Sequence, residues 1–403
     1  MTATHSAATN TEATYGWVER AFHWAIAIGI VLAVALGKLA HDAPFATDAE
    51  LARKAWLFSF HKTVGVTIFF VALARIGWAL AQPRPRPMHP KRRAETLLAA
   101  TVHWLLYGSL LLVPALGWAE HAATTGFAPI WWPFGQGLPF VPVDPELAKT
   151  LATLHTTFVK VLVAAVLLHV VGALKHVFVD RDLTLARMWR GADPGPLPAS
   201  GRHVLPLVAA LGVWGATLAV GLALVPAGAP AAPQIAAETT ARANWTVEEG
   251  TLSITVTQMG APVTGRFADW QAAIDFDETP RADGTLGTVE AVIGTGSLTL
   301  GSVTTQATGP EFLDAAGFPT ARFDAVIRAE GDGYVADGTF GLRGVEIPLV
   351  LPFTLQIDGD RATMAGQVAL DRRDFGMGAA YPDETNVGFG VTIDVALIAL
   401  RDG

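Results

Sequence analysis

The sequence predicts a membrane all-α helical bundle followed by an all-β antiparallel barrel, and three observations lead to this fold class. The chain has 403 residues, of which 51% are hydrophobic and only 16% are charged. Its mean hydropathy of +0.38 is too high for an ordinary soluble enzyme. Long apolar stretches fill the first half of the chain, whereas short segments that alternate apolar with polar residues fill the second half.

Five apolar stretches in the first half are long enough to cross a bilayer, which takes about 20 residues in a helix. They lie at about 18–40, 56–81, 97–119, 151–178 and 204–225. Arginine and lysine gather in the loop after the second stretch and in the segment after the fourth. By the positive-inside rule we expect these loops and the N-terminus in the cytoplasm, and the C-terminal half on the outer side.

The charges are divided unevenly along the chain. Residues 1–237 carry a net charge of +6, whereas residues 238–403 carry −14 and contain no lysine. The acidic half has no basic stripe of the kind that binds nucleic acid, so we expect no nucleic-acid partner. The chain also has no cysteine. This excludes disulfides, iron–sulfur clusters, thiolate-ligated haem and covalently attached c-type haem.

Four histidines lie where they could bind two haem groups inside the predicted bundle. His155 and His169 are fourteen residues apart on the fourth stretch, which is about 21 Å along a helix and about 40° around it. His23 and His61 stand at the entrances of the first and second stretches, on opposite membrane sides if the helices alternate in direction. The expected pairs are His23 with His169 and His61 with His155. Because neutral imidazole is a common axial ligand in b-type sites, the pattern predicts two haem b groups.

The order and spacing of four motifs carry a family resemblance. The motifs are RAFHWAIAIGI, FSFHKTVGVTIFFVALARIGW, VHWLLYGSLLLVPALGW and LHTTFVKVLVAAVLLHVVGALKHVFVDRD. Over residues about 14–190 they resemble the bacterial cytochrome b-561 family. The resemblance implies a four-helix dihaem cytochrome of the bacterial inner membrane that exchanges electrons with quinones, with the four histidines as axial ligands. It also places His103 on a histidine of the family pattern, as a contact to a haem propionate or a quinone.

Other residues near the expected haems keep two interpretations open. Arg75 and Lys175 could pair with haem propionates on the cytoplasmic side, or they could be interfacial cations whose long side chains reach water. Trp131 and Trp132 could belong to an interfacial aromatic belt, or they could form a lid over the outer haem or part of a quinol cleft.

From about residue 240 the apolar residues recur with period two, between turns rich in glycine, aspartate and proline. About eight strands at this spacing predict a closed antiparallel barrel or a sandwich, interrupted by one short helix at 309–317. Aromatic residues are candidates for an apolar lipid pocket, although a one-residue slip in register would reverse which of them point inward. These candidates are Phe267, Trp270, Phe323, Phe340 and Phe353.

Motifs in this second half carry another resemblance. They include GAPVTGRFADWQAAIDFD, EFLDAAGFPTARFDAVI, DGTFGLRGVEIPLVLPFTL, ALDRRDFGMG and VGFGVTIDVALIAL. Over residues about 240–403 they resemble the YceI-like family. The resemblance implies a periplasmic, lipocalin-like barrel that binds polyisoprenoid chains, including isoprenoid quinones.

The expected domain order follows from these observations. It is a disordered tail at 1–14, a cytochrome b561-like four-helix domain at 15–200, a fifth transmembrane helix at 201–226, an Ala/Pro linker at 227–239 and the barrel at 240–403.

The expected function is that of a membrane dihaem b-type cytochrome. It would transfer electrons to or from an isoprenoid quinone such as ubiquinone, which makes it an oxidoreductase or electron carrier, and its periplasmic barrel would bind the isoprenoid. An alternative is a periplasmic polyisoprenoid carrier for which the haem domain is chiefly a membrane anchor. A metal transporter is a third alternative, disfavoured because the apolar stretches hold so few carboxylates. The expected partners are the lipid bilayer, the quinone or polyisoprenoid and a redox partner that the sequence does not identify, and a homodimer is left open.

Overall fold

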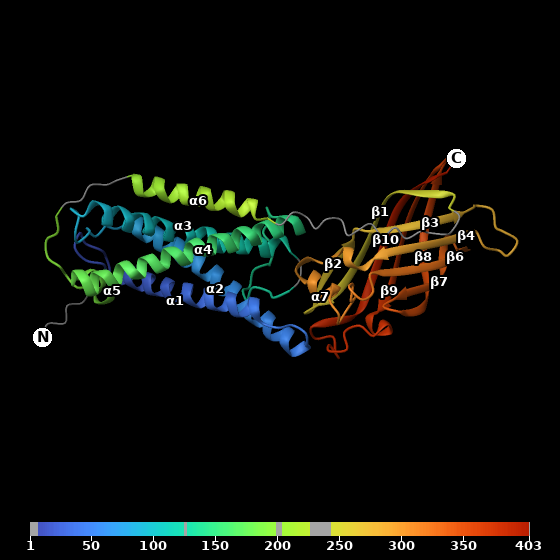
Figure 1. Cartoon of the computed structure of the whole chain (residues 1–403), viewed down its shortest axis with the longest axis horizontal. Helices are drawn as coiled ribbons and strands as arrows, with labels where there is room; N and C mark the ends of the chain where they lie inside the picture. Colours follow the sequence, from blue (N-terminus) through green and yellow to red (C-terminus); the bar gives the residue numbers. More distant parts are fainter. Residues whose placement is uncertain (1–6, 125–126, 199–203, 226–242, 403) are drawn as a thin grey trace. The chain divides into compact units, whose positions relative to one another are not determined.

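The computed structural model describes residues 7–124, 127–198, 204–225 and 243–402. These residues form a helical part and a strand-rich part (Figure 1). The predicted linker at 227–239 and the first six residues of the predicted tail lie outside the described residues.

The helical part is dominated by five long apolar helices, which confirms the predicted bundle. They are α1 (Trp17–Asp42), α2 (Asp48–Leu80), α3 (Arg93–Ala123), α4 (Pro145–Lys175) and α6 (Leu205–Ala223). Each is long and apolar enough to cross a membrane. A π-helical turn, η1 (His176–Asp180), extends α4, and the short helix α5 (Thr184–Arg190) follows it. The structure therefore contains the five predicted spans.

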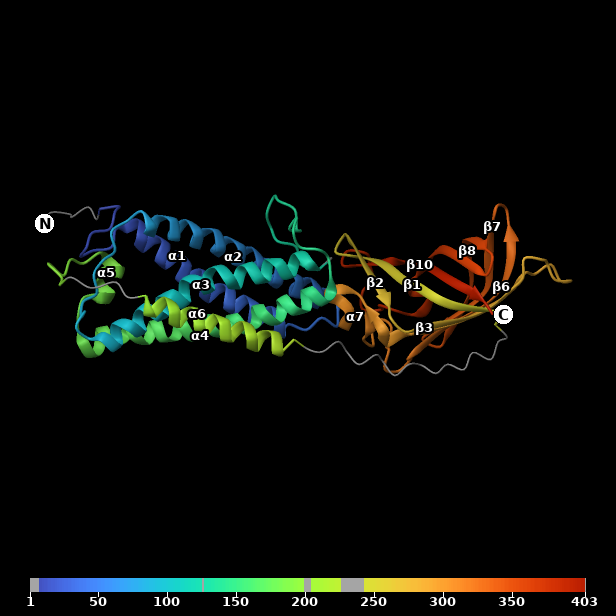
Figure 2. The same cartoon turned by 90° about the horizontal axis from the view of Figure 1, so that it is seen from above.

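Helices α1 to α4 lie side by side along their lengths (Figures 1 and 2). Their apolar faces meet where Ile26 of α1, Ile68 of α2 and Leu110 of α3 pack together in one buried cluster. A second cluster joins Val113 of α3 to Phe158 of α4. These contacts hold four helices at close range, so side chains that point into the bundle from different helices can face one another.

Helix α6 packs against α3 and α4 rather than extending the row of the other helices (Figure 2). Its Ala210 is buried between Leu105 of α3 and Ala165 of α4. Its Trp214 lies over Gly108 of α3, where an added Cβ atom would come within 1.9 Å of the indole ring. A glycine at this position therefore lets the large ring reach the surface of α3.

The strand-rich part is a closed antiparallel barrel, as predicted. Its strands are β1 (Trp245–Gln258), β2 (Ala261–Phe267), β3 (Trp270–Phe276), β4 (Gly287–Gly294), β5 (Leu298–Thr299), β6 (Thr320–Glu330), β7 (Gly333–Leu342), β8 (Val345–Asp358), β9 (Arg361–Asp371) and β10 (Val387–Arg401). Eight of them close the barrel in the order β10-β9-β8-β7-β6-β4-β3-β1, and β1 pairs back onto β10. Strand β2 pairs with the second half of β1, and the short strand β5 pairs with β2.

Tight two-residue turns set the register of two hairpins. Met259 and Gly260 both have positive φ, 50° and 78°, between β1 and β2. Arg343 and Gly344 repeat this conformation, at 53° and 73°, between β7 and β8. Turns with positive φ at both central residues match the right-handed twist of the strands they join, so they favour the observed pairing.

The short helix of the barrel is not where the sequence predicted it. Residues 309–317 form successive turns, in which Asp314 has a φ of 46°. The helical turn is α7 (Thr304–Thr308), immediately before them. Gly309, an extended residue, ends α7, and Pro310 follows. Because proline disfavours helical backbone in the residue before it, the helix cannot run on into the predicted range.

Candidate functional site

The two histidines expected near the outer side face each other inside the bundle. The ring centres of His61 on α2 and His155 on α4 are 6.3 Å apart, and the ring planes are nearly perpendicular at 85°. The Nδ1 atom of His61 is 2.8 Å from the carbonyl oxygen of Ala33, and that of His155 is 2.9 Å from the carbonyl oxygen of Val113. A carbonyl can only accept, so each Nδ1 donates a proton. The lone pair of each ring is therefore on Nε2, the form that binds a metal.

A glycine one helical turn beyond each carbonyl leaves space for the histidine ring. A Cβ atom on Gly37 would lie 2.9 Å from Cε1 of His61, and one on Gly117 would lie 3.0 Å from Cε1 of His155. Both glycines follow their carbonyl residue by four positions, on α1 and α3 respectively. The prediction from sequence missed these two residues. The signal was present, since the pattern Ala-Leu-Gly, three residues, His occurs at 35–41 and again at 115–121.

Three histidines lie close together at the depth that was predicted for the second haem, the one expected between His23 and His169. His23 on α1 and His169 on α4 have ring centres 6.0 Å apart, with the planes inclined at 58°. His103 on α3 is closer to His169, with ring centres 5.2 Å apart. His103 thus lies beside the pair that the sequence predicted, in contact distance of one of its members.

The ring separations can be compared with what a bridging iron requires. An iron bound by both Nε2 atoms would separate the ring centres by roughly 6 Å, since each metal–nitrogen bond is about 2.0 Å long and Nε2 lies about 1.1 Å from its ring centre. The pairs His23–His169 and His61–His155 fit this distance, at 6.0 and 6.3 Å. The pair His103–His169, at 5.2 Å, is too close. The residues present therefore fit two bis-histidine iron sites, with His103 as a neighbour of one of them.

The two candidate propionate partners already have carboxylate partners within the protein. Arg75 donates to Glu19 at 3.0 Å in a pair whose side chains are almost fully buried. Lys175 lies 2.6 Å from Glu95 and 2.8 Å from Asp180. A buried cation such as Arg75 needs a compensating charge, which Glu19 supplies.

The two tryptophans of the loop before α4 pack on the bundle near the outer histidine pair. The Trp131 ring stacks on Phe60, with centres 5.9 Å apart. Its backbone N–H donates to Thr63 Oγ1 at 2.9 Å. Trp132 packs edge-on against Trp118 of α3. Phe60 and Thr63 flank His61 on α2, so Trp131 contacts the residues next to His61 in sequence, and both interpretations of the tryptophans stay open.

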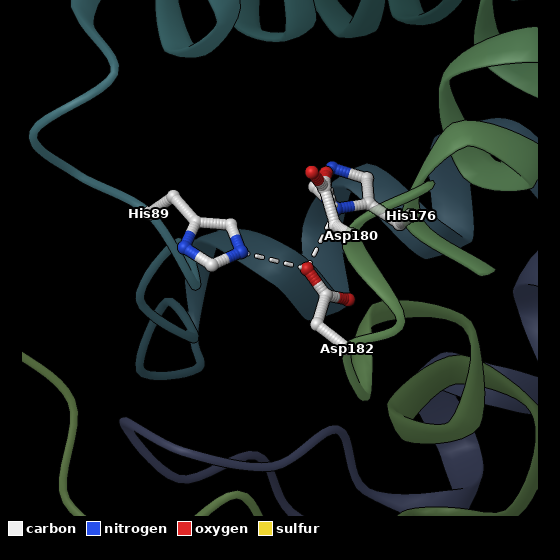
Figure 3. A group of neighbouring side chains, drawn as sticks. All are labelled: His89, His176, Asp180 and Asp182. Atoms are coloured by element: carbon white, nitrogen blue, oxygen red, sulfur yellow. Dashed lines mark hydrogen bonds and ion pairs between the residues drawn. The ribbon is translucent and has the colours of Figure 1, made fainter. Parts of the chain in front are cut away.

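A cluster of histidines and aspartates lies where α4 ends and the α2–α3 loop passes it (Figure 3). Nε2 of His89 lies 2.9 Å from Oδ2 of Asp182, and Nδ1 of His176 lies 2.8 Å from the same oxygen. The two imidazole rings are parallel within 7°, with centres 6.1 Å apart. Oδ1 of Asp182 accepts from the backbone N–H of Thr184. Asp182 therefore ties the loop, the end of α4 and the start of α5 together.

The four side chains offer donor atoms within 4.8 Å of one another, a spacing that would suit a metal ion. However, Asp180 is already paired with two cations, Arg92 at 2.7 Å and Lys175 at 2.8 Å. These cations neutralise the carboxylate and would repel a divalent ion. The cluster is thus better described as an ion-paired network that closes this end of the bundle than as a metal centre.

The barrel encloses an apolar cavity of about 140 Å³. Its wall includes side chains of β1, β7 and β10 and of the segment between β4 and β6. Phe267 and Phe340, two of the predicted pocket residues, line it. Trp270, Phe323 and Phe353 do not line the cavity and pack in the clusters of the barrel core. Phe323 still points inward, because it pairs with Phe340 across β6 and β7.

Comparison with known proteins relates each part of the chain to a family. Residues 14–191 match the family model of prokaryotic cytochrome b561, and residues 245–399 match that of the YceI-like domain. Among curated proteins, "Cytochrome b561 homolog 2" of Escherichia coli is 29% identical over 187 residues, which is 45% of this chain and 93% of the relative. The "Probable superoxide oxidase CybB" of Yersinia pestis is 27% identical over 176 residues, which is 43% of this chain and 94% of the relative.

Solved structures match the C-terminal part. The crystal structure of Burkholderia cenocepacia BcnA is 27% identical, covers 37% of this chain and 95% of its own, and has a TM-score of 0.34. The Campylobacter jejuni YceI protein is 17% identical, covers 34% of this chain and 85% of its own, and has a TM-score of 0.30. The two resemblances expected from the motifs are confirmed by the family matches. The chain is therefore similar to prokaryotic cytochrome b561 over residues 14–191 and to the YceI-like domain over residues 245–399.

Proposed function

We propose that this chain is a dihaem b-type cytochrome of the bacterial inner membrane that exchanges electrons with an isoprenoid quinone, and that its periplasmic barrel binds the isoprenoid tail. The cytochrome b561 family implies b-type haem. One observation supports two haems, one for each histidine pair. In both pairs the distance between the ring centres, 6.0 and 6.3 Å, is about what an iron bound by both rings would need.

In this proposal the residues around the pairs prepare them for ligation. The carbonyls of Ala33 and Val113 keep a proton on Nδ1 of the outer histidines, so that Nε2 is free to bind iron. Gly37 and Gly117 leave room for the rings. The apolar helices exclude water from the pairs. The haem supplies reversible one-electron chemistry, and the protein contributes ligands, spacing and a low dielectric.

The orientation of the protein is part of the proposal. The basic loops after α2 and α4 favour a cytoplasmic N-terminus. Because α6 crosses once more, the barrel would be periplasmic. The apolar cavity of the barrel supports an isoprenoid ligand, since burying an isoprenoid tail there is favourable by roughly 25 cal/mol per Å2 of apolar surface.

Haem stoichiometry tests the proposal. The purified full-length chain should contain two haems. Substituting alanine for either member of a pair should remove that pair's haem, so His61→Ala and His155→Ala should share one difference spectrum and His23→Ala and His169→Ala another. His89→Ala is the matched control, because His89 lies in the loop after α2, where it pairs with Asp182 and belongs to neither histidine pair. One haem per chain, or loss of a haem in the control, would contradict the assignment.

A second candidate concerns the electron donor. A relative that matches residues of the cytochrome region bears the name of a probable superoxide oxidase. In this chain Lys62 follows the outer ligand His61, and its ammonium group lies 3.2 Å from Nδ1 of His121. A cation beside the outer pair would attract a small anion. Superoxide would give up one electron to become O2, and two such electrons with two protons would reduce a quinone to a quinol. Quinone reduction on adding superoxide, weakened in Lys62→Gln, would support this donor, and no reduction would exclude it.

A further inference from the structure

The barrel cavity has a polar end, formed where β1 finishes and β10 begins. Gln258 is the last residue of β1 and is only 3% exposed. It follows Leu252, Ile254 and Val256 at alternate positions, and all four line the cavity. Since alternate residues of a strand point to the same face, the Gln258 side chain points into the barrel. An amide thus ends an otherwise apolar row.

Hydrogen bonds at this end orient the amide. The Tyr381 hydroxyl accepts from Nε2 of Gln306 at 3.0 Å, so Oε1 of Gln306 faces Gln258. Nε2 of Gln258 donates to that oxygen at 3.4 Å. Oε1 of Gln258 is left without a hydrogen-bond partner. Among the described residues that line the cavity, it is the one buried side-chain oxygen or nitrogen in this state.

The one cation among the described residues that line the cavity already has hydrogen-bond partners. Arg372 is 3% exposed, and its guanidinium group makes five hydrogen bonds to backbone carbonyls. The acceptors are Met377, Gly378, Tyr381, Val387 and Gly388. A guanidinium group has five N–H donors, so this set uses its full capacity. Arg372 therefore fixes the loop before β10 and keeps no donor for the oxygen of a ligand.

We propose that the barrel selects isoprenoids whose head group carries a hydroxyl, and that this hydroxyl donates its hydrogen bond to Oε1 of Gln258. This inference rests on the proposed function, in which the cavity takes an isoprenoid tail. A buried acceptor without a partner is costly, so a ligand that supplies a donor is favoured over one that does not. A polyprenol and a quinol both have such a hydroxyl. A quinone presents only acceptor oxygens there, which would leave Oε1 unpaired.

Binding of matched ligands to the full-length protein tests the proposal. The first pair is solanesol, a long-chain polyprenol, and its methyl ether, which has the same tail without the hydroxyl hydrogen. Wild-type protein should bind the alcohol about tenfold more tightly than the ether, the size of one net hydrogen bond. Gln258→Met keeps the length of the side chain without the acceptor, and it should bind both ligands equally. Gln356→Met makes the same change on the exposed face of β8 and should keep the tenfold preference.

The outcomes separate this inference from the function on which it rests. Equal binding of alcohol and ether by wild-type protein would overturn the selection of a hydroxyl, while leaving isoprenoid binding intact. Failure to bind either ligand would reject the isoprenoid function itself. A second pair, a long-tail quinol and its quinone, identifies the source of the hydroxyl. If wild-type protein prefers the quinol and Gln258→Met does not, the ligand class includes quinols. If only the alcohol is preferred over its ether, the ligand is a polyprenol.

Discussion

Each histidine of the outer pair depends on two residues of a neighbouring helix, a carbonyl and a glycine four positions later. The carbonyl alone could not hold the ring in this position. A Cβ atom at the glycine would lie 2.9 Å from the imidazole at Gly37 and 3.0 Å from it at Gly117, which is closer than non-bonded carbon atoms normally approach. The same arrangement appears on α1 facing α2 and on α3 facing α4. Both helix pairs therefore position a histidine ring with a carbonyl hydrogen bond and a glycine that leaves space for the ring.

Substitution of these glycines should disturb the outer pair selectively. Gly37→Val would place methyl groups against His61, and close-packed interiors do not absorb such a change without shifts. We expect haem per chain to fall to about half, with the outer spectral component lost. Gly212→Val on α6 is the matched control, since a Cβ at Gly212 has open space around it, α6 carries none of the four histidines, and the cost to the helix is the same. Equal haem content in the two variants would show that the ring does not depend on Gly37.

At the scale of elements, the end of α4 is held by the network in Figure 3 in addition to its own backbone hydrogen bonds. The helix loosens into the π turn η1 before Arg181 takes a left-handed conformation, with φ 54°. Asp182 then bonds to His89, His176 and Thr184. Burial raises the pKa of Asp182, but the hydrogen bonds from Thr184 and His176 outweigh it and hold the pKa below the ordinary 3.8.

Removal of this carboxylate should loosen this end of the bundle. Asp182→Asn should lower the free energy of unfolding by about 1–3 kcal/mol. Because the folded-state pKa is depressed, the carboxylate stabilises the fold above its ordinary pKa, and this stability is lost as the pH falls through the lower, folded-state value. Thermal unfolding between neutral and acid pH should show the loss in wild-type protein and not in the variant. Asp193→Asn, in an exposed turn nearby, should behave as wild type, and an identical pH dependence in Asp182→Asn would contradict the role of the network.

The sequence predicted the five spans correctly but placed the start of the second one too late. Hydropathy found five spans but started the second at 56, whereas α2 begins at Asp48. Residues 48–55 include four charged side chains, so they lie outside any apolar window. A capping signal was nonetheless there, because Thr47 and Glu50 form the reciprocal hydrogen bonds of a capping box.

The sequence could not predict which barrel residues line the cavity. The period-two pattern predicted a closed barrel, but membership of the cavity depends on register and depth. Phe267 and Phe340 line the cavity, while Trp270 packs in the core near Trp245. Gln258 had no distinguishing pattern, since a single glutamine at a strand end is ordinary in sequence. Its unpaired oxygen becomes visible only when the neighbouring hydrogen bonds are known.

At the scale of the whole molecule, the proposed topology makes a prediction about access. If the barrel is periplasmic, protease added to intact spheroplasts should cut within residues 226–238 and release it. A cytoplasmic protein assayed in the same sample should remain intact, as a control for membrane integrity. Complete protection of the barrel in intact spheroplasts, with cleavage after lysis, would mean that the orientation is inverted.

The joining of the two parts has a physical consequence for electron exchange. A covalent tether raises the effective concentration of one part at the other to the order of millimolar. A barrel that holds an isoprenoid tail would thus raise the supply of long-tail quinol at the outer pair. Quinols without a tail would gain nothing from it, because they bury little apolar surface in the cavity.

The most direct test of this account compares how fast a long-tail and a tail-less quinol reduce the haems of two proteins, the full chain and a chain ending at residue 226. Stopped-flow absorbance in the same detergent would give the four rates. We predict unchanged haem spectra on truncation, a slower reaction with the long-tail quinol and an unchanged reaction with the tail-less one. Equal rates in the two proteins with both quinols would contradict a role of the barrel in electron exchange, and loss of haem on truncation would mean that the barrel instead supports the structure of the bundle.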